Sequence, residues 1–509
     1  MLARPAPQAQ LPLIGRHADL EVVLHQRVQA ARGLVRVVLV GGEPGIGKSR
    51  LLDALAARAA EAGATVLRGG SSDAAGMPPY LPFLEALGEH VLATDAATLY
   101  AQAGPLAPVL ATILPELALR LGELPSSYVL PPEQARLRLF EAVDGFLAAI
   151  AGDRLLVVLL DDLQWADPAA LDLLCHIARR HRPGSPLLIV GAFRADELEL
   201  NPALQRAVAE LNRLRVSTRV ALQRLGADEV AAMAAAYLGG PLAPAAIQPL
   251  FAHSEGNPFF VEELLLGWLE RGVLVRRNGP DGGALYDLTP SVALPLPTSI
   301  VAAVRQRLAR LAPPVAELLR VAAVIGRTFD AERVAVVAGR DAENVDECFG
   351  EAARAQLIRP LDAGAYTFSH DKIRESLSQD LTPSRLRRLH GAIGRALEAD
   401  AERSGARQLA ELAFHFARAG DAGRGVRYAI GAAEDAMRSY APAEAAAHLR
   451  AALGLLPAGD ARRGGLQARL TVTTPSSRPF VASRSGRDMP VTTPALRAGG
   501  VRRAWWRAR

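Results

Sequence analysis

Residues 42–49, GEPGIGKS, have the types and spacing that bind a chain of phosphates. They follow an apolar, β-branched run at 35–40 and precede the helical pattern LLDALAARAAEAG, so the expected context is strand, turn and helix. We expect Gly42, Gly45 and Gly47 to take positive φ and to bring backbone N–H groups close to one anion. A turn that only reversed the chain would need no particular side chain after its last glycine.

The two residues after that glycine supply the remaining chemistry. Lys48 can reach the terminal phosphates, and Ser49 can coordinate Mg²⁺ at the positive end of the helix that starts there. Only two of the 58 basic residues are lysines, Lys48 and Lys372, so Lys48 is interpreted as required for its compact point charge. The expected nucleotide contacts in this stretch are Gly42, Glu43, Pro44, Gly45, Ile46, Gly47, Lys48, Ser49 and Arg50.

A pair of acids provides a second chemical element. Asp161 and Asp162 follow six apolar residues at 155–160, which predict a fully buried parallel strand. Ligands of open α/β sheets bind at the carboxyl ends of strands, so we expect Asp161 to hold Mg²⁺ and Asp162 to orient or deprotonate an attacking water. Asp167, which precedes Pro168, is the better candidate for the cap of the next helix. Asp162 is one methylene shorter than glutamate, which suggests slow hydrolysis.

Other candidate site residues lie at element ends. Arg194 follows an apolar strand at 187–193 and would either sense phosphate or be a surface charge. Gly15 and Arg16 lie in a loop before the first strand, where they could line a nucleotide base. Pro258 follows Gly256 and Asn257 at a sharp helix start, where it would either serve the cap or contact nucleotide.

The predicted fold is an α/β P-loop NTPase of the ASCE type with a five-stranded, mainly parallel sheet, because helical patterns separate five apolar runs. Expected strands lie at 35–40, 64–70, 155–160, 187–193 and 216–222. The expected domains are the NTPase core at 1–222, a helical lid without strands at 223–295, a winged-helix-like part at 296–380, TPR-like helices at 381–470 and a disordered basic tail at 471–509. The winged-helix part should include a hairpin that turns at Asp362, Ala363 and Gly364.

Charge and composition narrow the function. The net charge is +5, but residues 471–509 carry eight arginines and one aspartate, so residues 1–470 carry −2. Residues 296–380 hold 11 basic and 12 acidic residues, which favours a protein partner over DNA. No apolar run suggests a membrane span or a signal sequence, and the two cysteines have no metal-like spacing. We therefore expect a cytoplasmic protein.

Several motifs in order, including GRHADL, GEPGIGKS, LLVVLLDDLQWADP, SEGNPFFVEELL, VIGRTFD and FSHDKIRE, resemble the large ATP-binding regulators of the LuxR and MalT type, which are STAND-class relatives of AAA ATPases. The resemblance implies an ATP/ADP switch that self-associates when ATP-bound and senses an inducer or protein through its C-terminal helices. It implies that Arg194 is a sensor and that His370 meets the ADP phosphate; a hydrogen-bonded histidine at a helix start is the alternative.

The resemblance is incomplete at the C-terminus. Those regulators end in a helix-turn-helix after a long repeat array, and this chain has neither, so its tail is interpreted as a truncated or frameshifted end. Direct DNA binding is therefore not expected. The predicted function is an ATP-binding, Mg²⁺-dependent regulatory NTPase with slow or gated hydrolysis, a weak ATPase. The alternatives are a replication-initiator-like DNA-binding AAA ATPase, and an enzyme with steady turnover or the remnant of an adenylate cyclase or kinase fusion.

Overall fold

The computed structural model divides by its contacts into residues 1–474 and residues 475–509. It describes residues 12–72, 77–122, 124, 130–278, 284–289, 305, 307, 308, 311–361, 364–404 and 408–473, all of which belong to the first unit. The expected basic tail beyond residue 473 therefore lies outside the described residues, as do Asp362 and Ala363 of the expected hairpin turn.

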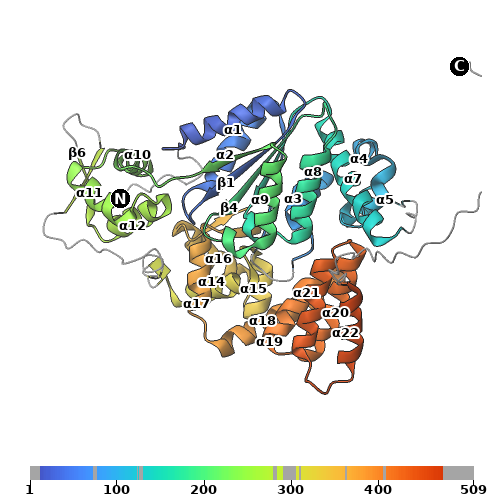
Figure 1. Ribbon diagram of the computed structural model, residues 1–509. Helices are drawn as coiled ribbons and strands as arrows, with labels where there is room; N and C mark the ends of the chain where they lie inside the picture. Colours follow the sequence, from blue (N-terminus) through green and yellow to red (C-terminus); the bar gives the residue numbers. More distant parts are fainter. Residues whose placement is uncertain are drawn as a thin grey trace, which may run out of the picture. The chain divides into compact units, whose positions relative to one another are not determined.

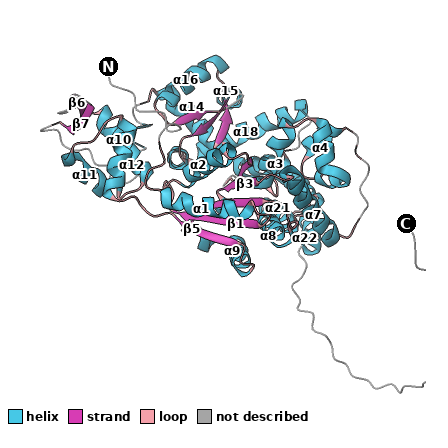
Figure 2. Cartoon of the chain, turned by 90° about the horizontal axis from the view of Figure 1, so that it is seen from above, coloured by secondary structure: helices cyan, strands magenta, loops and turns pink. Residues whose placement is uncertain are grey.

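A five-stranded sheet forms the centre of the N-terminal part (Figures 1 and 2), and its order is β2-β3-β4-β1-β5. All of its neighbouring strands are parallel, which confirms the predicted P-loop NTPase fold. The order places β4 between β1 and β3, so the carboxyl ends of these three strands meet at one edge of the sheet. The strands are β1 (Val35–Gly42), β2 (Thr65–Gly70), β3 (Leu156–Asp161), β4 (Leu187–Arg194) and β5 (Ser217–Ala221).

Helices cover both faces of this sheet (Figure 1), which is why β3 and β4 are apolar up to their last residues, Asp161 and Arg194. Successive strand residues point to opposite faces: Val38 and Val40 join one core, whereas Val37 and Leu39 join the other. The first core includes residues of α1 (His17–Ala30) and α2 (Lys48–Glu61). The second includes residues of α3 (Leu81–Ala93), α7 (Pro132–Ala151), α8 (Pro168–Arg180) and α9 (Pro202–Arg213).

Short helices fill the proline- and leucine-rich stretch between β2 and α7, as its irregular proline spacing predicts. After α3 these are α4 (Ala96–Ala103), α5 (Ala107–Leu110) and α6 (Pro115–Leu121). They pack against α3 and α7 on one side of the sheet.

The part predicted to be a helical lid, called the lid below, follows β5 and contains α10 (Ala227–Leu238), α11 (Pro244–Ser254) and α12 (Pro258–Glu270). The prediction that this part has no strands is wrong, because β6 (Leu274–Asn278) and β7 (Ala284–Leu288) pair as an antiparallel hairpin. Each of these strands buries one side chain, Leu274 and Tyr286 respectively, against the lid helices. That single apolar position per strand was too weak a pattern to predict the hairpin.

The next part, residues 311–361 and 364–379, is called the small-sheet module here. Its three short strands, in the order β8-β10-β9, are antiparallel, and the β9–β10 pair lies at the predicted hairpin. Its elements are α14 (Pro313–Ile325), β8 (Thr328–Asp330), α15 (Ala331–Ala338), α16 (Ala342–Arg354), β9 (Ile358–Pro360), β10 (Ala365–Phe368) and α17 (Asp371–Gln379).

Five C-terminal helices complete the described chain, and consecutive helices pack on one another. They are α18 (Pro383–Ser404), α19 (Leu409–Ala419), α20 (Ala422–Arg438), α21 (Pro442–Leu455) and α22 (Arg462–Thr473). Because α22 continues to Thr473, the helical region extends slightly beyond the predicted boundary at residue 470.

No helix among the residues that the structure describes combines the length and the apolar character needed to cross a membrane.

Candidate functional site

The turn after β1 forms the predicted phosphate-binding loop. Gly45 and Gly47 have φ of 81° and 101°, as expected, but Gly42 is the last residue of β1 and has no positive φ. Gly42 is required instead for close packing, since a Cβ there would lie 2.8 Å from Cγ2 of Ile46. The expectation of a left-handed backbone at Gly42 is therefore wrong, while the strand, turn and helix context is confirmed.

Lys48 begins α2 and lies over this turn. Its Nζ donates to the carbonyl oxygens of Gly42 and Glu43, at 3.0 Å each. The side chain is buried, and burial lowers the pKa of its ammonium against the opposing charges of Asp162 and Asp161. A buried ammonium next to acids and backbone amides is suited to an anion carrying a divalent ion.

Ser49 and Asp161 meet directly. The Ser49 Oγ donates to Oδ2 of Asp161 at 2.6 Å, and Oδ1 of Asp161 accepts the backbone N–H of Asp162 at 3.0 Å. A hydroxyl and a carboxylate are hard oxygen donors of the kind that Mg²⁺ prefers. Within the described part of the chain no group of three or more His, Cys, Asp or Glu residues could hold a metal ion. The Ser49 hydroxyl and the Asp161 carboxylate fit Mg²⁺ held by a few protein oxygens together with phosphate oxygens.

Both carboxylate oxygens of Asp162 are engaged. Oδ1 accepts from Nε2 of Gln164 at 2.8 Å, and Oδ2 accepts from a guanidinium nitrogen of Arg327 at 2.6 Å. Burial, followed by the charge of Asp161, raises the pKa of Asp162 to about 6. The backbone of Asp162 is left-handed, with φ 56° and ψ 41°, a conformation that these contacts must hold in place.

Gln164 joins Asp162 to the next strand. Its Oε1 accepts the backbone N–H of Arg194 at 3.0 Å, and its carbonyl oxygen accepts from Nδ2 of Asn201 at 2.9 Å. The side chain is buried. Gln164 was not predicted as a site residue, although it lies in the LQWADP motif.

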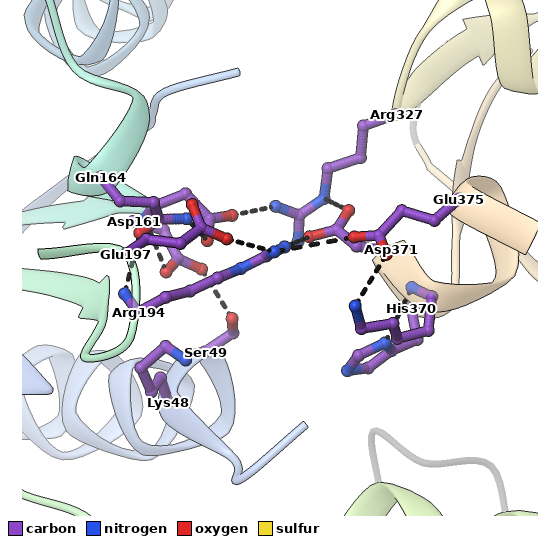
Figure 3. A network of polar contacts seen from close by, with 12 residues as sticks. Lys48, Ser49, Asp161, Gln164, Arg194, Glu197, Arg327, His370, Asp371 and Glu375 are labelled. Atoms are coloured by element: carbon purple, nitrogen blue, oxygen red, sulfur yellow. Dashed lines mark hydrogen bonds and ion pairs between the residues drawn. The ribbon is translucent and has the colours of Figure 1, made fainter. Parts of the chain in front are cut away.

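Arg194, at the end of β4, is not a surface charge, because only 6% of it is exposed. Its guanidinium donates to Asp371 at 3.0 Å and to Glu197 at 2.8 Å, and it stacks on Trp165 with its carbon 4.6 Å from the ring centre. Glu375 lies 3.6 Å away. Figure 3 shows this guanidinium pointing from the sheet edge toward the acids of the small-sheet module.

The small-sheet module contributes Arg327 and Asp371, neither of which was predicted as a site residue. Arg327 Nε lies 3.8 Å from Oδ1 of Asp371, so Asp371 faces both Arg327 and Arg194. Burial acts to raise the pKa of Asp371, but the nearby cations, Arg327 first, outweigh it and lower that pKa. The VIGRTFD and FSHDKIRE motifs contain these residues, and neither motif indicates by itself which partner each residue meets.

His370 is the residue before α17, and its ring stacks on Phe259 of the lid with centroids 3.8 Å apart. Its Nδ1 accepts the backbone N–H of Lys372 at 3.2 Å, so His370 is a hydrogen-bonded histidine at a helix start. Burial lowers the pKa of His370 to about 3, and the ring is therefore neutral at pH 7. With Nδ1 accepting, Nε2 carries the proton of the neutral ring and is a donor.

One cavity is lined by residues of the phosphate-binding loop, the lid and the small-sheet module, although Asp161 and Gln164 are not among its lining residues. The cavity lining includes apolar side chains, among them Pro12, Leu13, Ile14, Leu225, Met233, Pro258 and Phe259. It also includes polar and charged side chains, among them Lys48, Ser49, Asp162, Arg194, Arg327, Arg359, His370 and Asp371. A lining that combines apolar side chains with lysine and arginine suits a ligand with a flat base and an anionic tail.

Four predicted site residues do not line this cavity, namely the nucleotide contacts Gly15, Gly42 and Glu43 and the metal ligand Asp161. Gly15, with φ 66°, permits close packing instead, since a Cβ there would lie 2.6 Å from Cδ2 of Leu225. Arg16 lines the cavity but also supports the loop, because its guanidinium donates to the carbonyl oxygen of Ile46 at 3.1 Å. The other predicted contacts, Pro258 included, all line the cavity.

Asn257 fastens the lid to the phosphate-binding loop. Its Oδ1 accepts the backbone N–H groups of Phe259 and Phe260 as the cap of α12, and its Nδ2 donates to the carbonyl oxygen of Pro44 at 3.1 Å. The predicted helix start at Pro258 is confirmed. The second role of Asn257, on the loop, was not predicted.

The sheet order, the loop at Lys48 and the acid at the end of β3 define a P-loop NTPase fold of the AAA type. Residues 12–190 match the AAA ATPase domain family. This match covers the part of the chain from the loop before α1 to the middle of β4.

Solved structures with a similar fold have low sequence identity. A STAND protein with a tetratricopeptide repeat sensor from Pyrococcus horikoshii is 13% identical with a TM-score of 0.47, covering 92% of this chain and 63% of that one. The Aeropyrum pernix ORC2 protein is 14% identical with a TM-score of 0.31, covering 79% and 97%, and a Thermotoga maritima RuvB is 14% identical with a TM-score of 0.28, covering 72% and 96%. This chain thus spans 63% of the length of the Pyrococcus protein. No curated protein matches the chain.

Proposed function

We propose that this chain is a nucleotide-dependent conformational switch that binds ATP or ADP with Mg²⁺ and hydrolyses ATP slowly. The observation that carries the proposal is that one cavity receives side chains from three parts of the chain, the phosphate-binding loop, the lid and the small-sheet module. A ligand in such a cavity contacts all three, so its phosphate chain can alter the free energy of their docking.

Each chain residue has a role in this proposal. The amides of residues 45–49 and Lys48 bind the phosphate tail, and the apolar side chains of Ile14, Leu225 and Met233 receive the base. Ser49 and Asp161 would hold Mg²⁺, which when bound neutralises charge that develops on the phosphates. Asp162 would orient the attacking water.

The small-sheet module would read the phosphate end. Neutral His370 offers its Nε2 proton to a phosphate oxygen, and Asp371 holds Arg194. A third phosphate adds negative charge beside Asp371 and competes with it for Arg194, which favours release of the module. We infer that this module is a winged helix and that its release frees the chain for self-association, with an inducer acting through α18–α22.

The test is the nucleotide carried by the purified full chain, identified by mass spectrometry, followed by titration with ADP and ATP. Tightly held ADP is expected. Lys48→Ala should abolish binding of both nucleotides, whereas Lys372→Ala, the only other lysine position, should keep it because Lys372 is ion-paired with Glu375 and does not line the cavity. Retained affinity in Lys48→Ala would contradict the proposal. DNA binding without nucleotide binding, with the DNA binding detected by gel shift at physiological salt, would favour the replication-initiator-like alternative.

A further inference from the structure

Arg327 connects the small-sheet module to the acid that the proposed function assigns to water activation. It lies between α14 and β8 and reaches Asp162, 165 residues away in the sequence, with a 2.6 Å contact. Figure 3 shows it approaching from the module side, opposite to Gln164 and Arg194. Asp162 therefore has one partner from its own domain and one from the module.

These two partners differ in how they are held. Gln164 is buried in the NTPase core and is fixed by Arg194 and Asn201, so its contact with Asp162 persists wherever the module is. Arg327 belongs to the module, so its contact exists only while the module is docked. Arg327 is thus the one partner whose contact with Asp162 depends on the position of the module.

Acidic and basic side chains alternate across the boundary between the NTPase part and the small-sheet module. Asp162 pairs with Arg327, Arg327 faces Asp371 at 3.8 Å, and Asp371 pairs with Arg194 at 3.0 Å. Asp162 and Asp371 are both largely buried. A buried carboxylate without an ion-pair partner costs free energy, so each of these ion pairs stabilises the docked position of the small-sheet module.

We propose that Arg327 is a positioning residue that withholds Asp162 from water while the small-sheet module is docked, so that release of the module permits hydrolysis. This rests on the proposed function, whose site it regulates. A guanidinium on Oδ2 makes the carboxylate a weaker acceptor for a water proton and occupies space beside it in the cavity, which Arg327 and Asp162 both line. The left-handed backbone of Asp162 fits this role, because its side chain is held by contacts on both sides.

An arginine in a phosphate cavity could instead stabilise the transferred phosphoryl group, and the two roles predict opposite results. Removing a withholding residue raises the hydrolysis rate, whereas removing a phosphate-stabilising cation lowers it. The guanidinium of Arg327 faces two carboxylates, that of Asp162 at 2.6 Å and that of Asp371 at 3.8 Å, which favours the withholding role.

The experiment is single-turnover hydrolysis of ATP with Mg²⁺ by the full chain, at protein concentrations that saturate binding. Arg327→Gln should raise the rate by about tenfold, the effect of losing one charge-assisted hydrogen bond. ATP affinity, measured separately with a non-hydrolysable analogue, should change by less than about threefold. Arg327→Lys keeps the charge without the planar fork and should give a rate between those of the wild type and Arg327→Gln.

The matched control is Arg354→Gln. Arg354 lies in α16 of the same module, its Nε donates to the carbonyl oxygen of Gly350 in the same helix, and it does not line the cavity, so the rate of this variant should equal that of the wild type. A lower or unchanged rate in Arg327→Gln with retained affinity would overturn the proposal. If Arg327→Gln fails to fold, Arg327→Lys decides alone, because a rate at or below that of the wild type contradicts withholding. Absence of nucleotide binding by the wild type would instead reject the proposed function.

Discussion

Ser49 Oγ and Asp161 Oδ2 lie 2.6 Å apart although 112 residues separate them in the sequence. The contact joins the first turn of α2 to the carboxyl end of β3, because β1 and β3 both flank β4 in the sheet. It contains the two oxygens expected to hold Mg²⁺.

The first prediction concerns Mg²⁺. In the wild type, EDTA should weaken ATP binding, because the metal bridges the phosphates to Ser49 and Asp161. Ser49→Ala and Asp161→Asn should each reduce the Mg²⁺-dependent part of ATP affinity by about tenfold or more. The measurement is an ATP titration with Mg²⁺ and with EDTA. An unchanged ratio of the two affinities in both variants would place the metal elsewhere.

The second prediction concerns Arg194, which is buried and paired with Asp371 across the domain boundary. Arg194→Gln leaves the largely buried Asp371 with only the more distant Arg327 as a counter-charge and should lower the free energy of unfolding by about 3 kcal/mol. Adding Asp371→Asn should recover part of that loss, since the unpaired charge is then removed. Urea denaturation of the full chain measures both effects.

Its control is an exposed arginine of the same domain. Arg213 is exposed and pairs with Glu210, so Arg213→Gln should change stability by less than about 1 kcal/mol. Equal losses in Arg194→Gln and Arg213→Gln would show that the Arg194 pair adds nothing beyond an ordinary surface contact.

Sequence patterns predicted the parts of this site that depend on neighbouring residues. The five strands, the turn at Gly45 and Gly47, and the acids after β3 all follow from local apolar runs and spacing. The predicted role of Gly42, a positive φ, was wrong. A glycine is needed there for packing against Ile46, a contact that local backbone preference does not reveal.

Contacts between distant segments could not be predicted in the same way. The pairing of Arg327 with Asp162 spans 165 residues, and an arginine in a motif carries no signal of which acid it meets. Likewise, Asn257 was recognised at a helix start, but its hydrogen bond to Pro44 depends on how the lid packs on the loop. Such partners depend on tertiary packing. The periodicity of a single sequence carries no information about which distant residues meet.

The third prediction separates the two roles of Asn257. Asn257→Ala should lose about 1 kcal/mol of stability, as for other helix caps, and should also weaken ADP binding, because Pro44 loses its link to the lid. Asn257→Asp keeps the cap acceptor but loses the donor to Pro44, so it should retain stability and still weaken ADP binding. Asp421→Ala removes a cap of α20, away from the cavity, and should affect stability alone. Equal ADP affinity in all three variants would contradict the loop role.

The fourth prediction concerns the contact between α21 and α8. Oε1 of Glu444 accepts the backbone N–H of Ala169 at 3.3 Å, next to Asp167, whose carboxylate accepts from Ala170 and Tyr80. Oε2 of Glu444 is buried and has no hydrogen-bond partner among the residues that the structure describes. Two half-buried acidic residues thus face each other where the C-terminal helices meet the helix that follows β3, and one proton between their carboxyl groups would relieve their repulsion.

The charged and titratable groups around this pair come from each packed element. They are Asp167 and Asp172 of the α8 region, Arg136 of α7, Tyr80 before α3 and Glu444 of α21. Burial, and then the charge of Glu444, raises the pKa of Asp167 to about 7. Arg136 is paired with Asp172 and only partly compensates the two acids.

The sign of the pH effect follows from this raised pKa. The folded chain binds the proton of Asp167 more tightly than the unfolded chain does, so the docked state is most stable below the unfolded pKa near 4 and loses stability as the pH rises through 7. Glu444→Gln removes one of the two charges and should reduce the loss between pH 5.5 and pH 8 by about 1 kcal/mol. Glutamine can still accept from Ala169, so docking itself is kept.

Hydrogen exchange of the α21 amides, corrected for the intrinsic effect of pH, measures the docked state directly. In the wild type the protection of α21 should fall more steeply with pH than in Glu444→Gln, while the protection of β3 and β4 stays the same in both. Exposed Glu434 of α20, which pairs with Arg469 of α22, supplies the control, since Glu434→Gln lies on the same group of helices but does not approach α8. If Glu434→Gln flattened the pH profile as much as Glu444→Gln, the effect would come from the net charge of the helices. An identical, steep profile in all three proteins would show that the Asp167–Glu444 pair binds no extra proton on docking.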